Sequence, residues 1–408
     1  MLLLIKLAWR NIFRNTRRTL LAGLAIGIGL ASLIFTDAVI IGMEESMIRT
    51  ATDTFLGQGQ IHFEGFRSTF EVEKTINNLK GVLSNLQDER EIRSFSVRTQ
   101  AFSMLTSPMN VGSITLYGID PQLEREVSKI DEAIAHGAYL KPDDRGRILM
   151  GTKLAETLEV GLGDRVVVTV AQAETGALAQ EMFRVAGIFH FNSREMDGGV
   201  AFINLEKARE LLNLDEGAHE IALHFDDLDR AGDRSLDFWR RYSQNGNEAL
   251  GWKDLMPELD AAVQLSQFST LMVAFVLFSV VALGIMNTLF MSLYERMFEF
   301  GVLRAVGTRP FRMALTILFE AGALAIISII IGIAIGYAAT YYVSVRGIDY
   351  VGIEFGGVTL RELIYPVMHF NQFTLFPLYV FTFTLIAGIY PALFAAKLAP
   401  AKAMRRSF

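Results

Sequence analysis

The chain of 408 residues has no cysteine. Disulfide bonds, thiolate metal sites and cysteine nucleophiles are therefore excluded. It also lacks an H-E-x-x-H zinc-binding motif, and "GRILMGTK" at residues 146–153 only approaches a phosphate-binding loop, because Thr-Lys follows the second glycine where that loop has Lys-Ser or Lys-Thr. These absences argue against an enzyme. We expect no catalytic residue, no metal site and no cofactor bound by this chain.

Charge is scarce over long parts of the sequence. Four stretches have one charged residue or none, namely Leu20–Thr36, Ser266–Tyr294, Met313–Val345 and Asn371–Ala396. A helix needs about 20 mostly apolar residues to cross the hydrocarbon core of a bilayer. The pattern predicts four transmembrane helices. The alternative is a set of buried helices in a large soluble protein, but those rarely run so long without a polar face.

The expected fold class is an α-helical membrane protein with four transmembrane helices and a large α+β domain inserted between helices 1 and 2. The predicted segments are a basic amphipathic helix at 1–18, transmembrane helices at 19–43, 266–294, 313–345 and 372–396, the α+β domain at 44–265, a short charged helix at 295–312, a loop at 346–371 and a tail at 397–408. The first transmembrane helix is expected to be an uncleaved anchor, since its apolar run exceeds that of a signal peptide and no clear small-x-small cleavage site follows.

Basic residues predict the orientation. Thirteen lysines and arginines lie before the first predicted span, between the second and third, and after the fourth, whereas the segment between the third and fourth has two, Arg346 and Arg361. Such an excess marks cytoplasmic segments. Residues 44–265 are therefore expected outside. They contain 23 basic and 37 acidic residues, a net charge of −14, which argues against nucleic acid as a partner.

The outer domain alternates between strand and helix patterns. Residues 57–120 are typical of one β-α-β-β unit, and residues 145–226 of a second unit of strands and helices. Apolar positions continue at helical spacing from the first span to Phe55, and from Trp252 into the second span. This predicts two helical stalks; the alternative is ordinary helix ends packed under a globular domain.

A short charged segment, "ERMFEFGVLRAVGTRP" at 295–310, separates the second and third apolar stretches. It predicts one short helix along the cytoplasmic face, ended by Gly307 and Pro310. Such a helix could dock in a groove of a cytoplasmic motor protein. A solvated loop is the alternative.

Other features of the apolar stretches suggest where helices meet and where function lies. Gly23-x3-Gly27 and Gly332-x3-Gly336 would let helix backbones come close within a bilayer. Asp37 directly follows the first stretch, in the outer part of the predicted span at 19–43, and an acid there is costly and by default suggests function.

Three stretches resemble the ABC-transporter permeases of the MacB/FtsX-like superfamily: "LAWRNIFRNTRRTLLAGLAIGIGLASLIF" (7–35), "YERMFEFGVLRAVGTRPFRM" (294–313) and "YPALFAAKLAPAKAMR" (390–405). Within the outer domain, residues 185–212 and 251–265 resemble the lipoprotein-releasing (LolC/LolE-type) branch. The resemblance covers essentially the whole chain.

The resemblance implies a permease subunit that pairs with a second protomer, the same or homologous, and binds cytoplasmic ABC ATPase subunits, in which ATP and Mg are bound and hydrolysis occurs. It implies a bacterial inner membrane, a periplasmic domain and contact with membrane lipids. The implied function is extraction of lipoproteins, with a periplasmic chaperone as a further partner. The alternatives are a MacB-like efflux permease with a trans-envelope adaptor, and FtsX-like signalling to a cell-wall hydrolase.

The resemblance also assigns residues. The coupling helix corresponds to residues 294–309, with candidate ATPase-coupling residues Glu295, Arg296, Glu299, Arg304, Gly307 and Arg309. The resemblance implies a substrate path between the first two spans. Apolar side chains at the outer ends of these spans, spaced near four residues apart on the first, are its candidates: Phe35, Val39, Met43, Met47, Phe268, Leu271 and Met272. A hairpin that recruits the chaperone in one permease of the pair corresponds to residues 171–182 and is shorter here, with the candidates Glu174, Thr175, Gly176, Gln180 and Met182.

Overall fold

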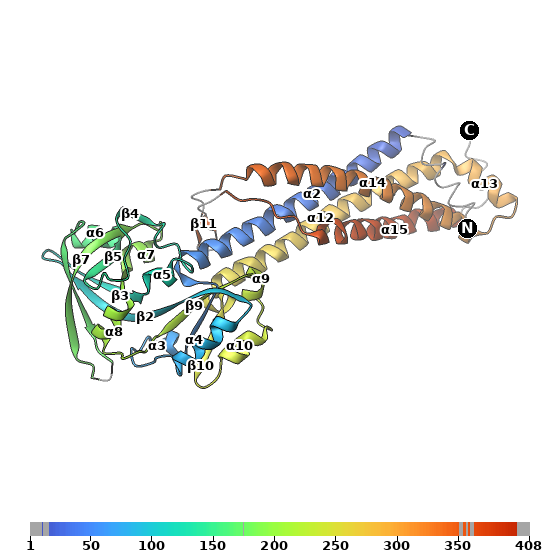
Figure 1. Cartoon of the computed structure of the whole chain (residues 1–408). Coiled ribbons are helices and arrows are strands. Elements are labelled where there is room, and N and C mark those ends of the chain that lie inside the picture. Colours follow the sequence, from blue (N-terminus) through green and yellow to red (C-terminus); the bar gives the residue numbers. More distant parts are fainter. Residues whose placement is uncertain are drawn as a thin grey trace. The chain divides into compact units, whose positions relative to one another are not determined.

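The computed structural model describes residues 10, 16–173, 175–350, 354–355, 358–359 and 363–397 (Figure 1). The chain divides into two compact units. We call Met1–Ser46, Val263–Val351 and Glu362–Phe408 the helical unit, and Met47–Ala262 with Gly352–Arg361 the sheet unit. The predicted helix at 1–18 and tail at 397–408 lie outside the described residues, apart from residues 10, 16–18 and 397.

Long helices dominate the helical unit. They are α2 (Thr16–Ala51), α12 (Pro257–Glu295), α14 (Pro310–Arg346) and α15 (Leu375–Ala396), with the short α13 (Met297–Ala305) between α12 and α14 and the 3-10 turn η3 (Phe370–Phe373) before α15. Each of the four long helices is long and apolar enough to cross a membrane. Helix α2 runs past the predicted span end at residue 43, and α12 begins before residue 266, so both continue beyond the uncharged stretches.

Apolar side chains from α2, α12, α13, α14 and α15 share one core. Within it, α2 and α14 approach closely at two glycines. A Cβ added at Gly27 would lie 3.0 Å from the carbonyl oxygen of Ser328, and one at Gly332 would lie 2.8 Å from the carbonyl oxygen of Gly27. The close backbone approach predicted from the glycine spacing is confirmed, and the two motifs contact each other.

The sheet unit is built on one mixed sheet of ten strands. The strands are β1 (Gly59–Phe63), β2 (Ile92–Thr106), β3 (Val111–Ile119), β4 (Ile134–Gly137), β5 (Arg147–Gly151), β6 (Arg165–Ala171), β7 (Leu178–Phe189), β8 (Val200–Asn204), β9 (Glu220–Phe225) and β10 (Asn247–Gly251). Their order is β10-β1-β9-β2-β3-β8-β5-β7-β4, and β6 pairs with β2 and β7. The pairs β3–β8 and β5–β7 are parallel and the others antiparallel.

Strand β2 pairs with different strands along its length. It pairs with β9 from Ile92 to Arg98, and with β6 from Ser103 to Thr106. The predicted division into successive units at 57–120 and 145–226 differs from this arrangement, because β9 lies between β1 and β2, and β8 lies beside β3. Local periodicity identifies strands but does not encode which distant strand each one pairs with.

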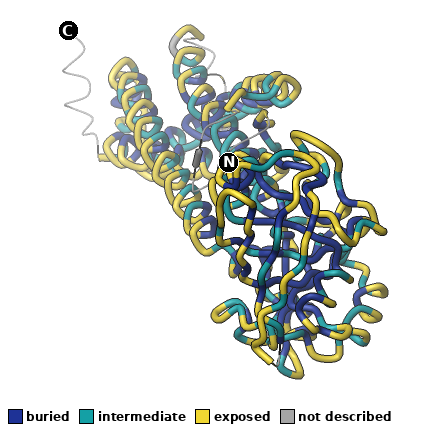
Figure 2. Tube along the Cα trace, turned by 90° about the vertical axis from the view of Figure 1, so that its left-hand side faces the viewer, coloured by how far each residue is buried: buried dark blue, intermediate teal, exposed yellow. Residues whose placement is uncertain are grey.

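Short helices complete the sheet unit, and a separate hairpin belongs to it. The helices are α3 (Phe66–Thr69), α4 (Leu79–Asp88), α5 (Pro121–Glu124), α6 (Thr152–Leu158), α7 (Arg194–Gly199), α8 (Leu205–Leu212), α9 (Leu228–Ala231), α10 (Asp237–Tyr242) and α11 (Trp252–Leu255). The hairpin pairs β11 (Glu354–Phe355) with β12 (Val358–Thr359). A π-helical turn, η2 (Thr52–Leu56), directly follows α2. Figure 2 shows the buried residues, in dark blue, filling the interior of the sheet unit.

Candidate functional site

The predicted coupling segment forms one short helix between two long ones. Helix α12 ends at Glu295, Arg296 leaves the helical conformation, and α13 begins at Met297. Gly307 then adopts a φ of 97°, a left-handed conformation that favours glycine after a helix end. Pro310 occupies the first turn of α14, where its missing N–H costs nothing.

Arg296 faces the interior of the helical unit. Only 11% of its side chain is exposed. Its Nε lies 3.1 Å from Oε2 of Glu299, its Nη1 lies 3.3 Å from Oε2 of Glu320, and its guanidinium carbon lies 5.1 Å from the ring centre of Phe300. This candidate coupling residue therefore contacts α13 and α14 of its own chain.

The outward face of α13 is largely apolar. Phe298 and Val302 of α13, and Val306 directly after its end, follow one another at intervals of four residues, and their exposed fractions are 51%, 40% and 82%. Residues at this spacing share one face of a helix. Sequence reasoning concentrated on the charges of this segment and missed the stripe, although the spacing within "FEFGVLRAV" signals it.

The other candidate coupling residues lie around this apolar stripe. Glu295, Glu299, Gly307 and Arg309 are exposed. Arg304 is half-buried and donates from Nη1 to the carbonyl oxygen of Thr308, 3.3 Å away. The charged side chains thus border the stripe, and Arg304 also bonds within the segment.

The candidate residues of the substrate path differ in exposure. Phe268, Leu271 and Met272 of α12 are exposed. On α2, Phe35, Val39 and Met43 are half-buried. Met47 is buried, with 1% exposed, and its role as a substrate-contacting residue stays a prediction. Spacing alone placed Met47 with the others, but packing covers it.

Asp37 has a polar partner far along the chain. The side-chain amide of Gln372, in η3, donates to Oδ2 of Asp37 at 2.8 Å. Gln372 is itself buried, and its amide oxygen accepts from the backbone N–H of His369. Asp37 is half-buried, and such a hydrogen bond offsets part of the cost of removing its carboxyl group from water. The sequence flagged Asp37 but offered no signal for this pairing.

The predicted hairpin joins β6 to β7. Ala171 and Leu178 face each other at its end, and Thr175 and Gly176 lie exposed in the turn, with a φ of 61° at Gly176. Glu174 lies outside the described residues. Gln180 donates to Oγ1 of Thr169 at 3.2 Å.

One face of this sheet region exposes apolar side chains. Phe102 and Met104 of β2, and Leu178 and Met182 of β7, are among the exposed large hydrophobic residues. The neighbouring positions Ala101 and Leu105 are fully buried in the core. Strand β2 is therefore apolar on both faces here. Exposed patches of this kind often mark interaction sites.

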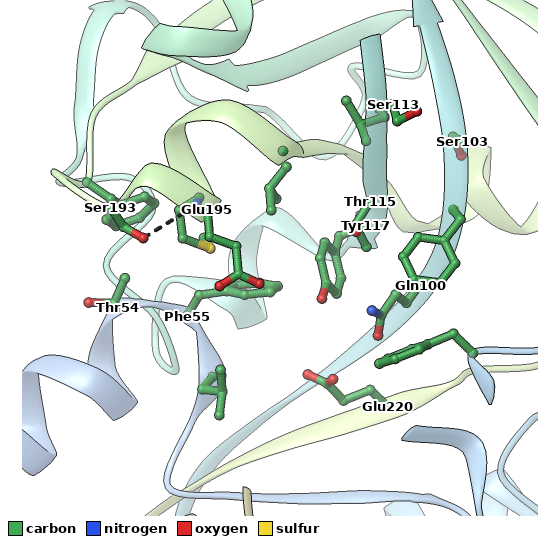
Figure 3. Close-up of a pocket in the computed structure, with 18 of the residues that line it drawn as sticks. Thr54, Phe55, Gln100, Ser103, Ser113, Thr115, Tyr117, Ser193, Glu195 and Glu220 are labelled. Carbon is green, nitrogen blue, oxygen red and sulfur yellow. Dashed lines mark hydrogen bonds between the residues drawn. The ribbon is translucent and has the colours of Figure 1, made fainter. Parts of the chain in front are cut away.

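An open groove of about 1570 Å³ lies in the sheet unit beside this face. Residues from η2, β2, β3, β6, α7 and β9 line it. Figure 3 shows Gln100, Tyr117, Glu195 and Glu220 directed toward one space, with Phe55 beside them. Burial, reinforced by Glu220, raises the pKa of the Tyr117 phenol above its usual value. Among the described residues, no group of three His, Asp or Glu side chains is placed to hold a metal ion.

A buried ionic network lies behind this groove. The Arg98 guanidinium, 0% exposed, donates to both oxygens of Glu124 at 2.6 and 3.0 Å and to Glu220 at 2.6 Å. It also stacks over the ring of Phe55 at 3.9 Å. Burial opposes the charge of Glu220, but Arg98 and His62 beside it outweigh burial and hold the pKa of that carboxyl below its usual value.

Two family models cover most of the chain. Residues 19–232 match a model described as the MacB-like periplasmic core domain, and residues 271–400 match one described as the FtsX-like permease C-terminal. The chain belongs to the MacB/FtsX-like family of ABC-transporter permeases. It is thus a multi-pass membrane protein with a periplasmic-type domain, and an ATPase partner is implied by the family.

Curated relatives of this permease include proteins named for lipoprotein release. It is 25% identical over 301 residues to the lipoprotein-releasing system transmembrane protein LolC of Xylella fastidiosa, covering 71% of this chain and 72% of the relative. It is 21% identical over 395 residues to LolE of Haemophilus influenzae, covering 94% and 93%. The periplasmic region of MacB from Actinobacillus actinomycetemcomitans is similar at 13% identity with a TM-score of 0.35, over 50% of this chain and 94% of that one. That structural likeness is too weak for a comparison of residues.

Proposed function

We propose that this permease extracts lipoproteins from a bacterial inner membrane by passing the motion of cytoplasmic ATPase subunits to its periplasmic domain. The observation that carries the proposal is the apolar surface that α12 leaves open. Only 11% of the apolar stretch of α12 is buried. The corresponding stretches of α2, α14 and α15 are 39%, 44% and 39% buried. An acylated substrate needs such a surface, because its chains favour hydrocarbon.

The coupling step is assigned to α13. Its exposed stripe of Phe298, Val302 and Val306 suits a groove of a partner protein, and Glu295, Glu299 and Arg309 at its border suit charge pairing around that groove. ATP and Mg would bind in the partner ATPase. A second permease protomer and membrane lipids would share the exposed faces of α2 and α12.

The periplasmic step is assigned to the exposed face of the sheet unit. Phe102, Met104, Leu178 and Met182 provide apolar surface in the part of the chain that is expected to face water. A periplasmic chaperone that accepts acyl chains is a partner of matching chemistry. The neighbouring hairpin around Thr175 is short, so the face rather than the turn would supply most of the contact.

Site-specific photocrosslinking tests the substrate assignment. Crosslinkers at Phe35, Val39 and Phe268 should capture lipoprotein in the absence of ATP and lose it when ATP binds. A crosslinker at Ile330, an exposed position on α14, is the matched control and should capture phospholipid alone. If the three test positions also captured only phospholipid, the lipoprotein assignment would be wrong.

Single-cysteine labelling tests the topology, since the chain has no native cysteine. In intact spheroplasts, Ser193→Cys should react with a membrane-impermeant maleimide and Thr308→Cys should not. Labelling of Thr308→Cys under these conditions would overturn the four-span arrangement with a cytoplasmic α13.

Substitutions on α13 test the coupling assignment. Glu295→Lys, Glu299→Lys and Arg304→Glu should reduce ATP-driven transport, because each places like charges opposite each other across the interface, which disfavours binding. Val306→Glu places a charge on the apolar stripe and should abolish copurification of the ATPase. Normal binding and transport by all four variants would mean that α13 does not couple this chain to an ATPase.

An efflux permease of the MacB type, or an FtsX-like signalling subunit, is the second candidate. The names of the two matching family models favour it. Purification of the permease in mild detergent separates these functions through the periplasmic partner that accompanies it. A lipoprotein chaperone supports the first proposal, a trans-envelope adaptor supports efflux, and a cell-wall hydrolase supports signalling.

A further inference from the structure

Glu320 is the one charged residue of the apolar stretch Met313–Val345. It lies on α14 and is buried, with 7% exposed. An acid inside a membrane span is costly and persists where it is paired and useful. Neither the charge pattern nor the coupling assignment explains why this position carries a carboxylate.

Glu320 links α14 to α12 and to the residue between α12 and α13. Its Oε1 accepts a hydrogen bond from Oγ of Ser292, near the end of α12, at 3.3 Å. Its Oε2 lies 3.3 Å from Nη1 of Arg296. Arg296 is the single residue between the end of α12 and the start of α13. The carboxylate therefore holds the point at which the chain changes from one helix to the other.

The surroundings of Arg296 limit how α13 can tilt. The guanidinium is planar and fixes several donors in one geometry, so it can bond two carboxylates at once. One is Glu320 and the other is Glu299, one turn into α13. Phe300 and Gly301, in the next part of α13, are buried. Movement of α13 about its start would have to stretch the bond between Arg296 and Glu320.

We propose that Glu320 is a positioning residue for coupling, which latches the start of α13 to α14 through Arg296. With this latch, a displacement of α13 reaches α14 directly, in addition to α12. The inference rests on the proposed function, because it takes α13 to be the helix that an ATPase moves.

Cysteine accessibility tests the latch without any partner. In the cysteine-free chain, Phe300→Cys reports whether α13 stays packed, since Phe300 is 2% exposed, and Phe298→Cys reports an exposed position. Adding Glu320→Gln should raise the maleimide labelling rate of Phe300→Cys about tenfold or more, because a hydrogen bond to a charged group is lost. The rate at Phe298→Cys should stay the same.

Glu299→Gln is the matched control for this experiment. It removes the other carboxylate bonded to Arg296, but that side chain is 47% exposed, against 10% for the Glu320 side chain. Exposed ion pairs contribute little. The labelling rate of Phe300→Cys should change less than about twofold. An equal increase for Glu299→Gln and Glu320→Gln would overturn the special role of Glu320.

A charge swap tests the pair itself. Glu320→Arg and Arg296→Glu should each raise labelling of Phe300→Cys, and the double variant should return it toward the original rate. No recovery in the double variant, with protein of normal yield and unfolding midpoint, would overturn the latch.

The assembled complex tests the link to coupling. Glu320→Gln should leave ATPase copurification intact and lower transport per ATP hydrolysed about tenfold. Unchanged transport together with raised labelling would overturn the coupling role. If the original permease bound no ATPase, the proposed function would fail instead, and the labelling results would still decide whether the latch exists.

Discussion

Arg98 in the sheet unit and Arg296 in the helical unit each bond two carboxylates. In the sheet unit, Arg98 is fully buried and its Nη2 and Nη1 atoms lie 2.6 Å from Glu124 and Glu220. In the helical unit, Arg296 keeps 11% of its side chain exposed, and its carboxylate contacts measure 3.1 and 3.3 Å. Short charge-assisted hydrogen bonds are the stronger ones.

The two networks differ in how much the loss of a carboxylate partner should cost. Arg98 ties η2, α5, β2 and β9 together through Phe55, Glu124 and Glu220, and it has no access to water that could replace a lost partner. Arg296 lies at a break between helices and keeps 11% of its side chain exposed, so the loss of one partner there should cost less than at Arg98. We expect the first network to hold the sheet unit rigid, and the second to hold the start of α13 in place less strongly.

Breaking the Arg98 network should have the largest effect. Arg98→Ala would leave Glu124 and Glu220 buried without their positive partner, which costs about 3–5 kcal/mol. The thermal unfolding midpoint of the full-length protein in detergent, followed by the fluorescence of Trp239 and Trp252, measures the loss. An unchanged midpoint would mean that the two carboxylates are neutralised by other means.

A variant in which all three residues of the Arg98 network are neutral tests whether the cost comes from unpaired charge. Arg98→Met combined with Glu124→Gln and Glu220→Gln removes the charges while keeping similar volumes. Replacing a whole buried ion network by neutral groups costs less than removing one member. The triple variant should therefore unfold at a higher temperature than Arg98→Ala. The opposite order would contradict the account of Arg98 as a charge partner.

In the helical unit, close packing rather than charge should dominate. Gly27→Leu inserts a side chain where a Cβ alone would lie 3.0 Å from the Ser328 carbonyl oxygen. Overpacking of this kind costs about 1–3 kcal/mol. The yield of monodisperse protein on gel filtration should fall. Gly284→Leu, on α12, is the control, because a Cβ there meets no atom within 4 Å.

The sheet unit should also respond to acid, through His219. Its Nδ1 accepts from the backbone N–H of Gln100 at 2.9 Å, its Nε2 lies 2.8 Å from the Val72 carbonyl oxygen, and burial lowers its pKa. The folded state thus binds this proton more weakly than the unfolded state. The contribution of neutral His219 to the free energy of unfolding is fully present above the ordinary histidine pKa of about 6.5. It is lost as pH falls through the lowered pKa of the folded state.

Unfolding midpoints between about pH 8 and about pH 5 measure this effect. His219→Gln should have a lower midpoint at neutral pH and a flatter dependence on pH below about 6.5. A variant with the same acid dependence as the original protein would assign the effect to other groups.

The smallest effects are expected from two serines that serve the two networks. Ser96 donates to Glu124 at 2.7 Å, whereas Ser292 donates to Glu320 at 3.3 Å. Each alanine substitution should cost about 0.5–1.5 kcal/mol, with Ser96→Ala nearer the upper end because its bond is shorter and fully buried. Equal midpoints for Ser96→Ala and Ser292→Ala would contradict the contrast between the networks.

Much of the fold follows from local sequence. The uncharged stretches predict α12, α14 and α15, since only long apolar helices satisfy their backbone groups within hydrocarbon. The charged segment after α12 predicts one short helix, and Gly307 and Pro310 lie where it ends and the next begins. These features depend on neighbours within a few turns, so composition and spacing suffice to find them.

The tertiary structure alone decided which distant residues meet. Asp37 pairs with Gln372, Arg296 with Glu320, and β9 enters between β1 and β2. It also turned Arg296 inward, buried Met47 and left Val306 exposed. Helical and strand periods specify the face on which a side chain lies, but the identity of what covers that face depends on the path of the whole chain.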